Sequence, residues 1–221
     1  VVNRAPTILL TAFGPFPGVS QNVSSDVVKR TMQHFADRGT SELNVTATLL
    51  PTEWRAATTT LTGALEAARP DAYVGFGVSR KACGFVVETL ARNAAASVDA
   101  NKQMPPQSQI LSRGVRYQTA TIPTRRIVSE LRALNLPARR SLNAGSYLCN
   151  TVLYLGLAHA NGSAVRGGCG FVHLPTQLAG HETDAKTPIA GVRMSLDDAV
   201  AGAVRLIDLL ADDLGVNRAG T

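Results

Sequence analysis

Short apolar runs alternate with amphipathic segments along this chain, a pattern typical of α/β proteins. The apolar runs predict strands over residues 7–11, 44–50, 71–78, 84–91, 117–123 and 170–174. Apolar residues at helical spacing predict helices near residues 24–38, 53–68, 124–134, 151–159 and 195–214. Together the two kinds of element predict a layered fold in which helices pack on a sheet.

Two of the expected helices carry recognisable start signals. Ser24 or Ser25 can cap the first helix. The segment Ser195-Leu196-Asp197-Asp198 resembles a capping box at the start of the last one. The helix near residues 53–68 should end before Pro70, because the residue that precedes a proline disfavours helical geometry.

The chain is expected to form a single domain over residues 1–221. Its length suits one hydrophobic core, and we find no internal repeat and no interdomain linker. Residues 95–114 are polar, lack periodicity and contain Pro105-Pro106. They predict a long loop, placed either over a binding site or at a contact between subunits.

The composition, 45% hydrophobic and 17% charged, is that of an ordinary globular protein. No run approaches the roughly 20 apolar residues that span a bilayer, and residues 1–6 lack the apolar segment of a secretory signal. We therefore expect a cytoplasmic protein without membrane attachment. The three cysteines, Cys83, Cys149 and Cys169, are odd in number and widely spaced, so no disulfide framework is expected.

Nucleic acids, metals and nucleotides are not expected ligands. The net charge is +6, but the basic residues are scattered, and the pairs Arg125-Arg126 and Arg139-Arg140 lack interleaved aromatic residues. No Cys or His pair has zinc-finger spacing, and no HExxH motif occurs. Gly75-Phe76-Gly77 begins like a dinucleotide-binding motif, but Arg80 stands where the third glycine would be.

The strongest candidate for chemistry is Cys149. The turn before it, residues 143–148, contains Gly145 and delivers the cysteine to the start of an apolar, helix-like run. The first turn of a helix presents unpaired backbone N–H groups and a partial positive charge. Both stabilise a thiolate, and the same N–H groups could hold an oxyanion formed when the sulfur attacks a carbonyl. Cys149 is therefore predicted to be a nucleophile.

A cysteine nucleophile needs a base, and His173 is the best of the four histidines. His34 is expected on a solvated helix face, His159 near the end of the helix that Cys149 begins, and His181 in an exposed polar loop. His173 ends the apolar run over residues 170–172, at the carboxyl end of a strand, where ligands sit in open α/β sheets. The alternative for His173 is a hydrogen-bonded core residue.

Glu88 is the candidate for the acid that orients this base. It interrupts an apolar stretch, and a carboxylate there must be paired if it is buried. Holding the imidazole of His173 would satisfy that need and stabilise the cation formed by proton transfer. The alternative is an edge strand on which Glu88 faces water. Cys83 and Cys169 are interpreted as inert buried thiols.

Four segments, in order over most of the chain, resemble the pyroglutamyl peptidase I family of cysteine peptidases, also called pyrrolidone-carboxylate peptidases. Residues 9–18 (LLTAFGPFPG) with Asn22 resemble the motif LLTGFxPFGG…N. Gly75-Phe76-Gly77 followed by Glu88 resembles the GxG…E segment, residues 144–150 (AGSYLCN) the motif AGxxxCN, and residues 170–175 (GFVHLP) the motif GFIHxP.

This resemblance implies an enzyme that removes N-terminal pyroglutamyl residues from peptides. Cys149 would attack the pyroglutamyl carbonyl, His173 would transfer the proton, and Glu88 would orient His173. The implied fold is a single α/β/α sandwich around a twisted, mixed, mostly parallel sheet, assembled as a homotetramer without a cofactor. The family positions that enclose the pyroglutamyl ring correspond to Phe13, Phe16, Asn22, Thr52, Tyr147 and Leu148.

The chain also departs from the family pattern. After the GxG turn the family has Ala-Gly-Gly-Arg, whereas residues 79–82 read Ser-Arg-Lys-Ala here, and Val78 replaces a common glutamine. The family arginine that helps the oxyanion aligns with Val98, so Arg92 or a backbone N–H would have to substitute for it. Two alternatives stay open: a nucleoside phosphorylase-like enzyme on a similar sandwich, and a non-catalytic or altered-specificity relative.

Overall fold

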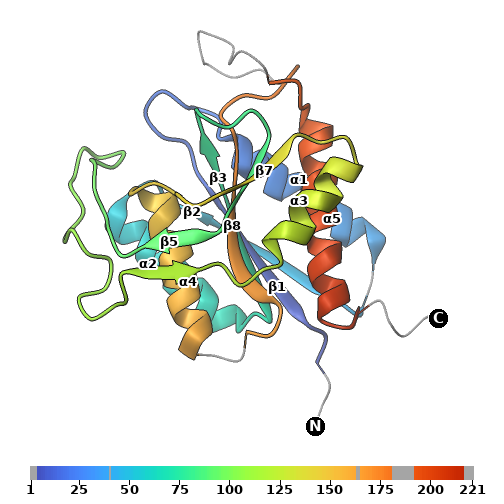
Figure 1. The fold of residues 1–221 in the computed structure, drawn as a ribbon, viewed down its shortest axis with the longest axis horizontal. Coiled ribbons are helices and arrows are strands. Elements are labelled where there is room, and N and C mark those ends of the chain that lie inside the picture. Colours follow the sequence, from blue (N-terminus) through green and yellow to red (C-terminus); the bar gives the residue numbers. More distant parts are fainter. Residues whose placement is uncertain (1–3, 40, 163–164, 181–191, 217–221) are drawn as a thin grey trace.

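A six-stranded sheet forms the middle layer of the fold, with helices on both of its faces (Figure 1). The computed structural model describes residues 4–39, 41–162, 165–180 and 192–216. The order of strands across the sheet is β2-β1-β3-β8-β4-β7. These strands are β1 (Thr7–Phe13), β2 (Asn44–Leu50), β3 (Ala72–Ser79), β4 (Phe85–Glu88), β7 (Ala138–Ser141) and β8 (Gly168–Pro175).

The sheet is mixed but mostly parallel. Among the described strands of this sheet, β4 and β8 form the one antiparallel pair. The carboxyl ends of β1, β2, β3 and β8 therefore lie along the same edge, which is where α/β sheets place their ligands. Two further strands, β5 (Leu90–Arg92) and β6 (Tyr117–Thr119), form a separate antiparallel pair.

The helices form two groups on opposite faces of the sheet (Figure 1). One face is covered by α1 (Val23–Arg38), α3 (Thr124–Ala133) and α5 (Leu196–Asp213). The other is covered by α2 (Trp54–Ala68) and α4 (Leu148–Gly162). The prediction of an α/β/α sandwich around a mixed, mostly parallel sheet is confirmed.

Alternation along the strands divides the core into two clusters, because successive strand residues point to opposite faces. Ile8, Leu10 and Phe76 belong to the cluster under α1 and α5. Leu9 and Phe171 belong to the cluster under α2 and α4. The same alternation determines on which face of the sheet each polar strand residue lies, and therefore whether that residue faces α4.

Most expected elements lie within a few residues of the observed ones, but three strand predictions were wrong. The stretch 84–91 is not one strand: it divides at Thr89, whose backbone N–H and hydroxyl both donate to Ser141 O at 2.7 Å. Beyond Thr89 the chain leaves the main sheet as β5. The strand expected over residues 117–123 ends at Thr119, and β7 was missed because its sequence, ARRS, has no apolar run.

Capping of the first helix also differs from the prediction. Asn22, not Ser24 or Ser25, is the N-cap of α1, and its side-chain oxygen accepts the N–H of Ser24. The capping box at the last helix is confirmed, since Ser195 and Asp198 exchange side-chain and backbone hydrogen bonds.

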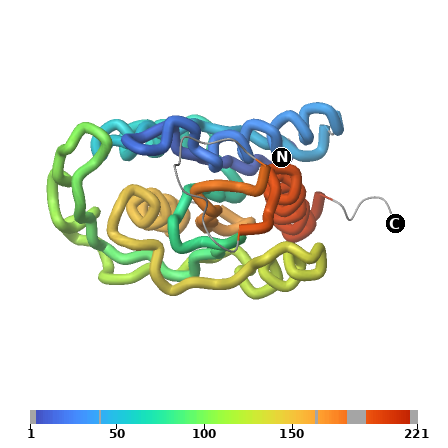
Figure 2. The backbone as a smooth tube through the Cα atoms, turned by 90° about the horizontal axis from the view of Figure 1, so that it is seen from above, coloured from blue at the N-terminus to red at the C-terminus, as the bar shows by residue number. Residues whose placement is uncertain are grey.

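Residues 95–114 form no helix or strand and make up the edge of the molecule farthest from α5 (Figure 2). Asp99 organises the start of this segment. Its carboxylate accepts the backbone N–H groups of Trp54 at 3.0 Å and of Asn101 and Gln103 at 2.9 Å. Burial raises the pKa of Asp99, but these bonds outweigh it and hold the pKa below its usual value. The segment is thereby tied to the start of α2.

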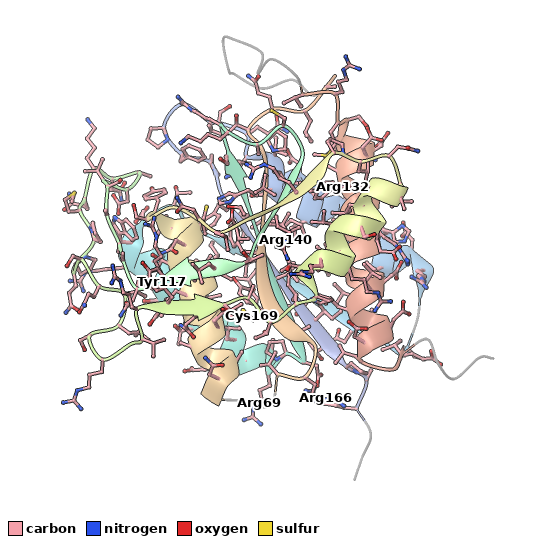
Figure 3. All side chains as sticks on the ribbon, viewed as in Figure 1. Arg69, Tyr117, Arg132, Arg140, Arg166 and Cys169 are labelled. Atoms are coloured by element: carbon pink, nitrogen blue, oxygen red, sulfur yellow. The ribbon has the colours of Figure 1, made fainter. Side chains whose placement is uncertain are left out.

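Basic side chains lie on separate parts of the molecule. Arg69 and Arg166 lie near one end, whereas Arg132 lies towards the other and Arg140 belongs to β7 (Figure 3). Arg166 is paired with Asp71, at an Nη2–Oδ1 distance of 3.2 Å. No described helix combines the length and the apolar character needed to cross a membrane.

Candidate active site

His173 and Glu88 meet because of the register between β8 and β4. Val86 lies opposite His173, and Glu88 lies opposite Phe171, so His173 and Glu88 are diagonal neighbours on the same face of an antiparallel pair. Their side chains reach each other: His173 Nδ1 is 2.9 Å from Glu88 Oε1. Glu88 is only 2% exposed, which excludes the alternative in which it faces water.

Cys149 reaches this pair from α4. It is the second residue of the helix, which packs on the face of the sheet that carries His173 and Glu88. The side chain of Cys149 is hydrogen-bonded to His173. Because Nδ1 is engaged by Glu88, Nε2 is the ring nitrogen left for the sulfur. The three side chains thus form a Cys–His–Glu chain, the arrangement of an activated thiol nucleophile.

The environment of His173 favours its charged form. Burial lowers the pKa of His173, but the charge and hydrogen bond of Cys149, together with those of Glu88, outweigh burial and raise it to about 10. At neutral pH the imidazolium therefore lies between Cys149 and Glu88. Glu88 Oε2 is buried and has no hydrogen-bond partner among the described residues, so His173 is the polar partner of this side chain through Oε1.

Gly77 makes room for the sulfur. A Cβ at this position would lie 3.0 Å from Cys149 Sγ and 2.8 Å from Cζ of Phe171. The Phe171 ring in turn meets the His173 ring edge-on, with centroids 5.0 Å apart. A side chain at position 77 would therefore displace the sulfur of Cys149 and the Phe171 ring that packs against His173.

Replacing Gly77 with alanine is expected to lower kcat for a pyroglutamyl substrate by roughly 10²-fold, because a small misplacement of reacting groups has a large effect. Overpacking should also lower the free energy of unfolding by about 1–3 kcal/mol. Gly63→Ala on α2 is the control, because a Cβ there meets nothing within 4 Å. Unchanged kcat in Gly77→Ala, measured beside thermal unfolding, would contradict this account of the site.

A cavity of about 210 Å³ opens beside Cys149, at the edge formed by the carboxyl ends of the parallel strands. All six residues predicted to enclose the pyroglutamyl ring line it. The complete lining is Phe13, Phe16, Asn22, Thr52, Val78, Arg80, Tyr147, Leu148, Cys149 and Thr176. Val78, Arg80 and Thr176 were not predicted as lining residues, although they lie at or just beyond the ends of β3 and β8, where a site of this class is expected.

The loops around the cavity are held by their own hydrogen bonds. Asn22 Nδ2 donates to Gly14 O at 3.0 Å, while its Oδ1 accepts from Ser24, so this amide fixes the loop that carries Phe13 and Phe16. The Thr52 hydroxyl donates to Pro15 O at 3.0 Å, which ties that loop to the start of α2. The walls are therefore largely pre-formed.

Tyr147 and the segment after residue 95 complete the entrance. The Tyr147 hydroxyl donates to Thr52 O at 3.4 Å, and the Ala96 N–H donates to Ser146 O at 2.7 Å. Burial, and then the charges of Asp99 and Cys149, raise the pKa of Tyr147 to about 12, so its hydroxyl is neutral at physiological pH. These contacts place part of the 95–114 segment against the turn that precedes Cys149.

Arg92 holds that turn. One terminal nitrogen of its guanidinium, Nη2, donates to Asn143 Oδ1 at 2.9 Å and to Gly145 O at 3.0 Å. Its backbone N–H donates to the buried side chain of Asn150, next to Cys149. Val98, at the position of the missing family arginine, is 53% exposed. The observed bonds of Arg92 thus suit positioning of the nucleophile turn rather than contact with an oxyanion.

The other sequence candidates lie elsewhere. His34 is exposed on α1, and His159 is in the last turn of α4. His181 lies outside the described residues. The prediction that Cys83 is buried was wrong: Cys83 is exposed in the turn after β3. Cys169 is fully buried, as predicted, and burial raises the pKa of its thiol.

No group of three or more His, Cys, Asp or Glu side chains within the described part of the chain is arranged to hold a metal ion. The polar groups around the cavity are instead amide, hydroxyl, thiol and guanidinium groups.

Comparison with known proteins assigns this site to a family. The family model described as pyroglutamyl peptidase matches residues 6–211, almost the whole chain. The chain belongs to the pyroglutamyl peptidase family. Among its relatives, the pyrrolidone-carboxylate peptidase of Klebsiella pneumoniae is 35% identical over 207 residues, covering 90% of this chain and 92% of that protein. Pyrrolidone-carboxylate peptidase 1 of Ralstonia nicotianae is 33% identical over 204 residues, covering 87% and 92%.

Solved structures of the pyroglutamyl peptidase family share the fold. A variant of pyrrolidone carboxyl peptidase from Pyrococcus furiosus superposes with a TM-score of 0.82 at 25% identity, covering 94% of this chain and 99% of that chain. Pyroglutamyl peptidase I from Bacillus amyloliquefaciens gives a TM-score of 0.81 at 22% identity, with coverage of 94% and 98%. The second likeness, at its low identity, supports the fold alone.

Proposed function

We propose that this chain is a cysteine exopeptidase that removes N-terminal pyroglutamyl residues from peptides. One observation carries the proposal: the Cys149–His173–Glu88 chain opens onto a small, mostly apolar cavity that suits a flat, uncharged lactam ring. Membership of the pyroglutamyl peptidase family supports the same activity. The proposed catalytic domain comprises the whole chain, residues 1–221.

In the proposed acylation step the Cys149 thiolate attacks the carbonyl carbon of the pyroglutamyl residue. The carbonyl oxygen becomes an oxyanion, and backbone N–H groups in the first turn of α4 are the proposed donors to it. The His173 imidazolium then gives its proton to the leaving nitrogen. The C–N bond breaks, the shortened peptide departs with a free amine, and a thioester to Cys149 remains.

Deacylation uses the same groups, but His173 now acts first as a base instead of an acid. Neutral His173 takes a proton from water, and the resulting hydroxide attacks the thioester carbonyl. The C–S bond breaks, pyroglutamate is released and the thiolate is regenerated beside the imidazolium. Glu88 holds the ring through Nδ1 in both steps, so that Nε2 stays directed at the reacting groups.

Recognition of the ring is assigned to the cavity residues. Phe13, Phe16 and Leu148 offer apolar surface to the two faces of the lactam. The N-terminus of an unmodified peptide carries an ammonium group. Transfer of this charge into such a cavity without a partner is unfavourable. A pyroglutamyl residue lacks this charge, and this difference is the proposed basis of selectivity.

The proposal predicts a clear order among three fluorogenic substrates that share one leaving amine. Pyroglutamyl-aminomethylcoumarin should be cleaved at least about 10²-fold faster, in kcat/KM, than the prolyl and glutaminyl analogues, which carry a charged amine. Fluorescence gives the rates, and mass spectrometry should identify pyroglutamate as the second product. Equal rates for the three would reject the specificity, and inactivity towards all three would favour a non-catalytic relative.

We also propose a cytoplasmic homotetramer that acts on peptides and not on nucleic acids. The family resemblance suggests this assembly. A contact between copies of the chain is supported by exposed apolar side chains over residues 98–117, namely Val98, Met104, Leu111, Val115 and Tyr117.

A further inference from the structure

Arg80 is a cationic side chain at the cavity that the proposed mechanism does not use. It follows β3 in a tight turn, in which the Ala82 N–H donates to Ser79 O at 3.1 Å and the Lys81 N–H to Ser79 Oγ at 3.3 Å. Arg80 is exposed, yet it lines the cavity together with Cys149. It makes no hydrogen bond or ion pair with any residue that the structure describes.

The charge of Arg80 has no counterpart in the cavity wall. Apart from the thiol of Cys149, the other lining residues are apolar or carry uncharged hydroxyl and amide groups. Lys81, the next residue of the same turn, is exposed and does not line the cavity. Of these two adjacent cationic residues, Arg80 is the one that lines the cavity.

Arg80 lies on the side of the cavity from which the leaving part of the substrate would extend. With the pyroglutamyl ring among Phe13, Phe16 and Leu148, the scissile carbonyl lies at Cys149, and the rest of the peptide must leave through the open side of the cavity. An exposed side chain that still lines the cavity is on that open side. A peptide bound in this way would extend its second residue towards the side of the cavity that Arg80 lines.

We propose that Arg80 makes this enzyme select pyroglutamyl peptides with a carboxylate immediately after the scissile bond. This inference rests on the proposed function. The carboxylate comes either from an acidic second residue or from the free C-terminus of a pyroglutamyl dipeptide. A guanidinium binds a carboxylate through two parallel hydrogen bonds, a geometry that an ammonium cannot supply.

Three substrates, compared in two pairs that share pyroglutamyl-glutamine amide, separate the two sources of the carboxylate. Pyroglutamyl-glutamic acid amide against pyroglutamyl-glutamine amide tests the side chain, because only the charge differs. Free pyroglutamyl-glutamine against its amide tests the C-terminal carboxylate. An arginine in contact with water is expected to give a preference of about two- to fivefold in kcat/KM for the charged member of at least one pair. The preference should decline as ionic strength rises.

Three variants test whether Arg80 causes the preference. In Arg80→Gln the ratio within each pair should approach one, and in Lys81→Gln it should stay at the wild-type value. Arg80→Glu should invert the selection, so that pyroglutamyl-lysine amide is cleaved faster than the glutamic acid amide. Because Arg80 is an exposed turn residue, thermal unfolding of all three variants should match that of the wild type.

Several results would overturn the proposal. The first is a wild-type ratio of one in both pairs, and the second is a preference that persists in Arg80→Gln. The third is an equal loss of rate in that variant for all three substrates, which would mean a role at the oxyanion. Failure of the proposed function is a separate result: the wild-type protein would then not cleave the uncharged glutamine amide at all.

Discussion

Replacing Cys149 with alanine is expected to lower kcat/KM for pyroglutamyl-aminomethylcoumarin by on the order of 10⁴-fold or more, because removal of a nucleophile abolishes the covalent route. The fold should survive, since the thiol is a small, half-buried group on the second residue of α4. Initial rates and circular dichroism of the wild type and the variant measure the two effects separately.

Cys83 provides a matched control for this experiment. It is a free, exposed thiol outside the cavity, so Cys83→Ala should keep full activity. An alkylating reagent should inactivate the wild type and Cys83→Ala at the same rate, and a saturating pyrrolidone ligand should protect both. Full activity in Cys149→Ala would exclude the proposed thioester mechanism, whatever the behaviour of Cys83.

Replacing Glu88 with glutamine is expected to lower kcat by about 10²- to 10⁴-fold, because the amide can no longer stabilise the imidazolium or fix its orientation. The carboxylate lies 2.9 Å from His173 Nδ1, and both side chains are buried, so water cannot readily replace it. Glu53→Gln is the control: Glu53 adjoins the cavity residue Thr52, but its side chain makes no capping hydrogen bond to α2.

The pH profile provides a second measurement on Glu88→Gln. A purely structural effect of the substitution would leave this profile unchanged. Burial lowers the pKa of His173, whereas Cys149 and Glu88 raise it, to about 10 in the native site. The protonated imidazole is therefore retained until the pH approaches 10, and activity should fall above it. Loss of the Glu88 charge removes one of the raising effects, so the alkaline limb of kcat/KM should move to lower pH. An unchanged limb would contradict the role of Glu88.

The local sequence was sufficient to predict several parts of this structure. The apolar runs at β1, β3 and β8 are long, so they specify buried strands without knowledge of their neighbours. The capping box at Ser195 depends on four consecutive residues and formed as expected. Cys149 was found in the same way, since its place at the start of a helix follows from the residues around it.

Other parts depended on contacts between distant segments. Nothing near Thr89 in the sequence indicates that the chain changes sheet there; the change depends on Ser141, 52 residues away. β7 has no apolar pattern, and it forms because β4 offers it an edge to pair with. The prediction for Cys83 was wrong because the neighbouring strand suggests burial, whereas the Cys83 side chain itself is exposed between the buried residues Ala82 and Gly84.

The sequence by itself determined the layered α/β architecture, the family motifs and the identities of the proposed nucleophile, base and acid, because each is encoded in a short run of residues. Only the tertiary structure decided that these three side chains meet. The antiparallel register of β4 on β8 brings Glu88 to His173, and Gly77 leaves space for the sulfur. It also decided that Arg80 rather than Lys81 lines the cavity. Register and side-chain direction depend on packing between distant segments, which local patterns do not encode.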